Sequence, residues 1–198
     1  MSSAFSLPAR PITAMRRVSW CQIGARRGGC MQTSEPAAPA RLLEGAFSGP
    51  GEFAQLVRDA LSTAASQGWT EMVWSDPNFE DWPLRERVVV DALQAWAGRG
   101  RKLVMLAHSF DSVIRFQPRF VQWRTTWDHV VECRVCRQLD ASEVPSALWS
   151  PHWAMRRLDL ARSTGMAGSE PQRRVLLRET LEECRRNSAP GFPSTVLG

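Results

Sequence analysis

Apolar residues in the first half of the chain follow two different spacings. Between Phe53 and Ala64 they recur every three or four positions, which predicts a helix that ends at Gly68. The same spacing predicts a second helix over residues 84–96. Residues 102–107 are instead an almost continuous apolar run, which is typical of a strand buried on both faces.

Strands and helices are therefore expected to alternate, joined by short connections. Strands are predicted at 42–47, 69–75, 102–107, 130–133, 147–149 and 153–158, and later helices from residue 110, over 119–127 and over 171–186. Alternation of this kind predicts an α/β fold with a mainly parallel sheet flanked by helices on both faces.

The chain has room for one domain of ordinary size, which we expect at residues 42–188. A disordered basic leader is expected before it, at 1–41, and a flexible tail after it, at 189–198. The leader is rich in arginine and lacks acidic residues in its first 30 positions. Two interpretations are open: a mitochondrial transit peptide, or translation that truly starts at Met31.

Charge is distributed unevenly between these parts. All of the net charge of +5 lies in residues 1–30, and the remaining residues hold 20 basic and 20 acidic side chains. A balanced body argues against binding to phosphate backbones, so nucleic acid is not expected as a partner. The chain has no apolar run of about 18 residues, so no contact with a membrane is expected.

Cysteine usage indicates a reducing, cytoplasmic location. Three of the five cysteines lie in the body, an odd number without the spacing of a disulfide framework. Cys133 and Cys136 form a CxxC pair, but a zinc site needs four ligands and no second pair exists. Neither a metal site nor a cofactor is predicted.

Polar residues follow two of the expected strands, where ligands collect in open α/β sheets. Asp76, Asn78 and Asp81 follow the strand at 69–75, and His108 and Asp111 follow the strand at 102–107. One interpretation is the edge of a ligand pocket. The alternative is that these residues form turns and caps, which suit Asp, Asn and Ser.

Residues 115–137 interleave arginines with aromatic side chains. Aromatic rings and guanidinium groups can stack on bases and hold phosphates, which makes Arg119, Trp123, Arg124 and Trp127 candidates for binding nucleic acid. The alternative places the aromatic rings in the core and the arginines on a solvated face.

A histidine and an aspartate seven residues apart, His152 and Asp159, are followed by the pair Gly168-Ser169. This pattern resembles the phospholipase D superfamily, whose signature is HxKxxxxD followed by a GS pair. The resemblance covers residues 45–185 and implies one half of a phospholipase D-like fold. Here the lysine of the signature is replaced by Ala154.

The resemblance implies that His152 is the nucleophile, that Asp159 orients it, and that Ser169 belongs to the site. Without the lysine a transferred phosphoryl group lacks its counter-charge. If residues 153–158 form a strand, Arg156 shares the face of Ala154 and is the plausible substitute, whereas the next arginine points away.

The main prediction is therefore a non-catalytic phospholipase D-like domain that acts in binding or assembly, with a homodimer as one arrangement. Two alternatives are open. The first is a divergent phosphodiesterase or phosphotransferase that uses His152, and the second is a nucleic-acid-binding module.

Overall fold

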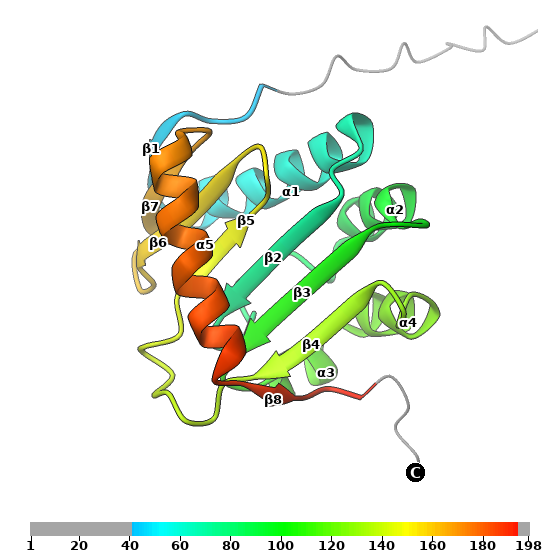
Figure 1. Ribbon diagram of the computed structural model, residues 1–198. Helices are drawn as coiled ribbons and strands as arrows, with labels where there is room; N and C mark the ends of the chain where they lie inside the picture. Colours follow the sequence, from blue (N-terminus) through cyan, green and yellow to red (C-terminus); the bar gives the residue numbers. More distant parts are fainter. Residues whose placement is uncertain (1–40, 194–198) are drawn as a thin grey trace, which may run out of the picture. The chain divides into compact units, whose positions relative to one another are not determined.

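The computed structural model describes residues 41–193, which fold around one eight-stranded sheet (Figure 1). The elements in chain order are β1 (Gly45–Phe47), α1 (Pro50–Gln67), β2 (Glu71–Asp76), α2 (Arg87–Trp96), β3 (Lys102–Ala107), α3 (Asp111–Phe116), α4 (Pro118–Thr126), β4 (Val131–Val135), β5 (Ser146–Trp149), β6 (Ala154–Asp159), β7 (Thr164–Gly168), α5 (Pro171–Arg186) and β8 (Ala189–Pro190). No helix among them is long and apolar enough to cross a bilayer.

The prediction of an α/β fold is confirmed, but the prediction of a mainly parallel sheet is wrong. The strand order is β1-β7-β6-β5-β2-β3-β4-β8, and only β2–β3 and β3–β4 pair in parallel. Strands β5, β6 and β7 follow one another through short turns, and such connections produce antiparallel neighbours. The first strand does not lie beside β2 either, because it pairs with β7 at the far edge.

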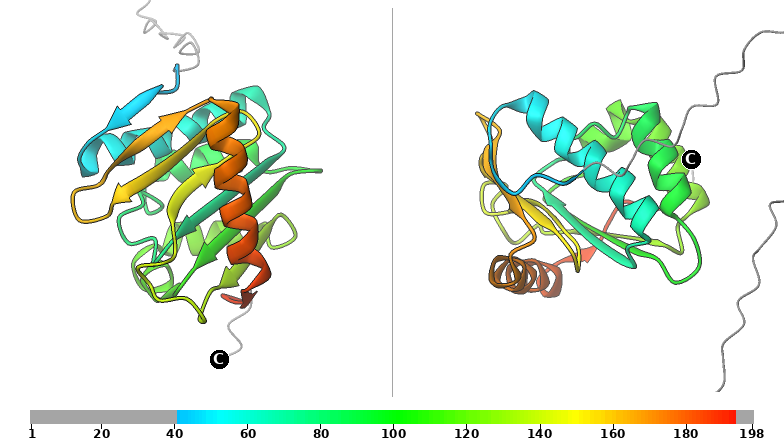
Figure 2. Two further views of the ribbon diagram at one scale, coloured as in Figure 1. Left: turned by 60° about the vertical axis from the view of Figure 1, so that its left-hand side comes forward. Right: turned by 90° about the horizontal axis from the view of Figure 1, so that it is seen from above.

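Helices cover the two faces of the sheet unequally. Helices α1, α2 and α4 pack on one face, and α5 lies alone across the other (Figure 2). The larger core lies beneath the first group, and a smaller apolar cluster lies under α5. The amphipathic pattern of α1 and the apolar run of β3 both predict this burial.

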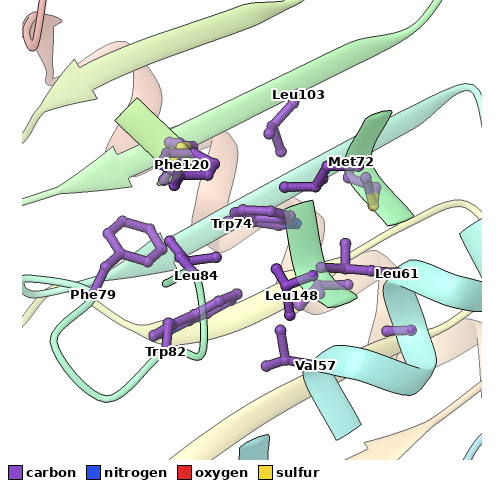
Figure 3. Packing of buried hydrophobic residues seen from close by; sticks show 14 of the residues in the cluster. Val57, Leu61, Met72, Trp74, Phe79, Trp82, Leu84, Leu103, Phe120 and Leu148 are labelled. Atoms are coloured by element: carbon purple, nitrogen blue, oxygen red, sulfur yellow. The ribbon is translucent and has the colours of Figure 1, made fainter. Parts of the chain in front are cut away.

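Tryptophan side chains fill the centre of the larger core. Figure 3 shows Trp74 of β2 near the centre of this cluster, together with Leu61 of α1 and Trp82 of the loop that follows β2. The rings of Trp74 and Trp82 lie 5.5 Å apart between centroids, and Phe79 packs on Trp82 at 5.0 Å. The loop between β2 and α2 is thus anchored to the core by its own aromatic residues.

Strand β7 is absent from the sequence-based expectation. Its residues, TGMAG, include two glycines, and Thr164 is its only β-branched or aromatic side chain of the kind that marks strands. Gly165 is required because β1 packs closely there: a Cβ atom would lie 2.6 Å from Cζ of Phe47 and 2.2 Å from the carbonyl oxygen of Arg156. Contact with neighbouring strands, not local preference, makes this segment a strand.

The flexible tail was expected to begin at residue 189, and the structure differs there. Ala189 and Pro190 pair with β4 as strand β8. Phe192 is buried, with its ring 5.3 Å from that of Phe110 and 4.3 Å from the guanidinium carbon of Arg124. The aromatic ring outweighs the surrounding Pro and Gly residues in deciding where this segment lies.

Candidate functional site

Asp76, at the carboxyl end of β2, is the centre of a buried polar network. Its Oδ1 atom accepts hydrogen bonds from the backbone N–H groups of Asn78 and Phe79, which form the turn after the strand. Its Oδ2 atom accepts from Trp82 Nε1 at 3.0 Å and from Ser146 Oγ at 2.6 Å. These bonds tie the turn to the sheet, as expected from the turn-forming alternative.

Arg157 of β6 supplies the charge that balances this carboxylate. Its side chain is 1% exposed and its Nη2 atom lies 2.7 Å from Asp76 Oδ2. The Nη1 atom donates to Asp81 Oδ2 at 2.9 Å, and the guanidinium group lies 4.2 Å from the centre of the Phe53 ring. Asp76 and Asp81 thus converge on one arginine, and the loop that carries Asp81 and leads to α2 is held in place.

The remaining pocket candidates contribute no side chain to this network. The side chain of Asn78 bonds within its own turn, to Glu80. His108 Nδ1 is bonded to the carbonyl oxygen of Leu139 at 3.1 Å, and Asp111 is exposed at the start of α3. The structure therefore places these residues in turns and at the start of a helix, and it does not gather the five candidates around one pocket.

The structure also separates the two residues of the histidine–aspartate pattern. His152 lies two residues before β6 and Asp159 is the last residue of β6, and the six residues of that strand alone span about 16 Å. His152 lies against the ring of Trp69, with centroids 6.0 Å apart. Asp159 accepts a hydrogen bond from the backbone N–H of Arg162 at 3.0 Å. The expectation that Asp159 orients His152 is wrong, because an extended strand holds them at opposite ends.

The other residues of the pattern divide between two hollows. Ser169 lines a hollow of about 660 Å³ together with His152 and Glu44, and its backbone N–H donates to the Glu44 carboxylate. Arg156 lines a different groove, of about 330 Å³, between β6 and α5. The expected strand pleat is confirmed, since Arg156 is exposed beside Ala154 and Arg157 is buried. Arg156 therefore does not stand in for the missing lysine beside His152.

The three cysteines of residues 41–193 are buried free thiols. Burial and the neighbouring Cys184 raise the pKa of Cys136 to about 11, so the protonated form is favoured at neutral pH. Burial likewise raises the pKa of Cys133, although Arg124 acts in the opposite direction. Within the same residues, no three side chains of His, Cys, Asp or Glu are grouped to hold a metal ion.

The four nucleic-acid candidates all belong to α4 or its end, but they face different surroundings. Arg124 is buried, and its Nε donates to Cys133 Sγ at 3.1 Å, so it is not available to a phosphate. Trp127 is half-buried, with its Nε1 bonded to Gln94 Oε1 at 2.9 Å. Trp123 is 4% exposed, and Arg119 is exposed.

Arg119 and Trp123 line a groove of about 500 Å³ between α2 and α4. Its other polar side chains come from both helices, namely Arg87, Asp91 and Gln94 of α2 and Gln122 and Thr126 of α4.

We term four exposed residues the arginine surface: Arg85, Arg115, Phe116 and Arg119, of which Arg119 also lines this groove. Arg119 Nη1 donates to the carbonyl oxygen of Arg85 at 3.0 Å, which joins the loop before α2 to α4. The guanidinium carbon of Arg115 lies 5.8 Å from the centre of the Phe116 ring. Phe116 is 56% exposed. None of these arginines forms an ion pair with another residue in the described range 41–193.

Sequence reasoning found part of this cluster. Arg115 and Phe116 belong to the segment in which arginines and aromatic residues interleave. Arg85 was not identified, because it lies some 30 residues earlier in a loop and carries no pattern of its own. Only the folded position of that loop brings it to α4.

No protein-family model matches the chain, and no curated protein matches it. Among solved structures, the chain is similar to TrmBL2, described as an archaeal chromatin protein that shows a novel mode of DNA binding. The identity is 16%, the TM-score is 0.54, and the likeness covers 81% of this chain. The chain matches only 57% of the length of that protein. This likeness is one of fold alone.

Two expectations are corrected by this comparison. The main prediction, a non-catalytic phospholipase D-like domain that acts in binding or assembly, is contradicted, because the similar structure is that of a DNA-binding protein and favours the nucleic-acid-binding alternative. The prediction that nucleic acid is not a partner is contradicted on the same ground. The family resemblance itself is tested by none of the comparisons and stays a prediction. At 16% sequence identity, this comparison shows that the chain shares its α/β fold with a chromatin protein.

Proposed function

We propose that the protein binds nucleic acid through the arginine surface. The observation that carries the proposal is that Arg85, Arg115 and Arg119 are exposed and form no ion pair among the described residues, and that Arg119 is hydrogen-bonded to the backbone of Arg85. In the same part of the chain, many other arginines are paired, for example Arg58 with Glu86 and Arg178 with Glu71. Guanidinium groups that lack an internal counter-ion are suited to phosphate oxygens.

Acidic and basic residues are equal in number in the body of the chain, and this balance argues against nucleic-acid binding. The count is a total over the whole surface, so one face can still be positive while another is negative. Two acidic residues near the cluster along the chain pair with other arginines: Glu86 binds Arg58 at 2.9 Å, and Asp91 lies 3.4 Å from Arg87. Asp111, four residues before Arg115, is an exposed single carboxylate against the three arginines. A local excess of positive charge thus exists within a body that is neutral as a whole. Such an excess on one face supports attraction of a phosphate backbone.

The DNA-binding role of the similar chromatin protein agrees with this proposal, although the likeness covers only part of that protein. The five arginines in residues 1–30 add further positive charge to the full chain. We assign them a contribution to affinity that depends on salt and not on base sequence.

The test is binding of fluorescently labelled DNA and RNA, followed by anisotropy over a range of salt concentrations. Replacing Arg85, Arg115 and Arg119 together by alanine is expected to weaken binding and to reduce the slope of log K against log[salt] by about 3, since each lost phosphate contact accounts for about 1. The matched control replaces Arg99, Arg137 and Arg186, which are exposed elsewhere, and keeps the net charge equal to that of the first variant.

Two results contradict the proposal. The first is that the full chain does not bind either nucleic acid at low salt. The second is that both triple variants lose affinity equally, which indicates that charge in general, and not this surface, is responsible. A chain that begins at Met31 is expected to bind with a smaller salt slope, and complete loss of its binding argues against the arginine surface.

A further inference from the structure

We infer that the groove of about 330 Å³ between β6 and α5 binds a small amphipathic anion of the fatty-acid class, with the hydrocarbon chain in the groove and the carboxylate at Arg156. We call this hollow the α5 groove. Helix α5 lies alone on its face of the sheet, opposite to α1, α2 and α4 (Figure 2). The inference goes beyond nucleic-acid binding and does not depend on it, because neither β6 nor α5 contributes to the arginine surface.

The lining of the α5 groove is mostly apolar. Of its eleven lining residues, only Arg156, Arg173 and Thr180 are polar or charged. Leu158 and Leu176, which line it from β6 and from α5, are 69% and 64% exposed. A hydrocarbon chain in the groove removes part of this leucine surface from water, and such burial of apolar area is favourable.

Arg156 gives the groove an unpaired positive charge. It is exposed and forms no ion pair with another residue in the range 41–193. Burial and Glu183 raise the pKa of the Cys184 thiol of α5, whereas Arg156 lowers it. Because a charge shifts a pKa mainly at short range, the guanidinium group lies close to α5. The second arginine of the lining, Arg173, is already paired with Glu170 at 2.7 Å, so an anionic head group complements Arg156.

The size and the hydrogen bonding of the α5 groove favour a small molecule with an apolar chain. Its volume lies at the lower end of the range of about 300–1,000 Å³ that is typical of ligand pockets. Covering a polar group that has no partner is costly. The one hydroxyl group of the lining, that of Thr180, already donates to the carbonyl oxygen of Leu176 at 3.0 Å. An apolar chain therefore leaves this hydroxyl group satisfied.

The experiment is equilibrium dialysis of the full chain against radiolabelled hexanoate, octanoate and decanoate, each below the concentration at which it forms micelles. We expect saturable binding that tightens by about twofold to fourfold for each added methylene group, up to the length of the groove. Decylamine, which is cationic at neutral pH, carries the same hydrocarbon chain as decanoate with the opposite charge. It is expected to bind about threefold to tenfold more weakly than decanoate, because Arg156 repels it.

Two variants with matched controls locate the site. Thr180→Phe is expected to weaken decanoate binding at least about tenfold, because the ring takes the place of several methylene groups. Thr125→Phe is its control, since Thr125 is an exposed threonine of α4 whose hydroxyl likewise donates to the carbonyl oxygen four residues earlier. Arg156→Gln is expected to weaken decanoate binding about threefold to fivefold and to leave decylamine no weaker. Arg99→Gln removes the same charge at an exposed position elsewhere.

Each outcome decides the question. The inference is overturned if decanoate shows no saturable binding, if Thr180→Phe binds it like Thr125→Phe, or if Arg156→Gln behaves like Arg99→Gln. Cosedimentation of the chain with anionic lipid vesicles, without uptake of the free acid, also overturns it, because the exposed leucines then serve a lipid surface. Arg156 is exposed, so its replacement keeps the test decisive even if Thr180→Phe does not fold. Nucleic-acid binding is expected to be unchanged by Thr180→Phe, which separates this inference from the proposed function.

Discussion

Replacing Arg157 by methionine is expected to lower the free energy of unfolding by about 3–5 kcal/mol. The substitution keeps an unbranched, flexible side chain, shorter than that of arginine, and leaves the carboxylate of Asp76 buried without its positive partner. It also removes the hydrogen bonds from Nε to Ser146 Oγ at 2.7 Å and from Nη1 to Asp81 Oδ2 at 2.9 Å. A buried charge that loses its partner has no solvent to compensate it, and this accounts for most of the cost.

Arg162→Met is the matched control, because it removes an arginine–aspartate pair at the end of the same strand. Arg162 is 83% exposed, with Nε 3.9 Å from Asp159 Oδ2, so the expected loss is about 0–1 kcal/mol. Both variants are measured by urea unfolding followed by circular dichroism, with the slope m expected to stay constant.

A double-mutant cycle sharpens this measurement. Once Arg157 is methionine, the further change Asp76→Asn is expected to cost much less than it does alone, because the uncompensated charge has gone. Additive losses, or an Arg157→Met loss no larger than that of Arg162→Met, would refute the reasoning that a buried ion pair holds the loop before α2.

Two further predictions concern the thiols and the end of the described chain. Because burial raises the pKa of Cys136 from 9.0 to about 11, its contribution to stability is fully present below pH 9 and is lost as the pH rises toward 11. Urea unfolding at several pH values measures this, and Cys136→Ala is expected to flatten the profile between pH 9 and 11. Phe192→Ala is expected to destabilise the fold by about 3–5 kcal/mol, since the ring packs on Phe110 and Arg124. A change in unfolding free energy below about 1 kcal/mol contradicts the buried position of Phe192.

Much of the first half of the fold can be predicted because its apolar pattern is strong and local. The periodicity of α1 and the apolar run of β3 directly reflect the faces they bury. The partner of β1 cannot be predicted in this way, since its pairing with β7 joins residues more than 100 positions apart. The glycines of β7 conceal a strand for the same reason: tertiary contacts decide it.

The candidate site shows the same limit at the level of side chains. Phe120, Trp123, Arg124 and Trp127 follow the spacing i, i+3, i+4, i+7, which places all four toward one face of α4. That spacing predicts that Arg124 points inward, where the structure places it against Cys133. Arg119 falls outside the pattern and is exposed. The position of Arg85 depends on the loop that Arg157 anchors, and no local signal reveals it.

The pleat of β6 makes its two neighbouring arginines chemically unequal. A slip of this strand by a single residue against β5 would place either Arg156 or Leu158 where Arg157 now lies, depending on the direction of the slip. With Leu158 in that place, Asp76 would have no guanidinium group at bonding distance. The buried charge thus penalises this misalignment electrostatically, in addition to the loss of packing.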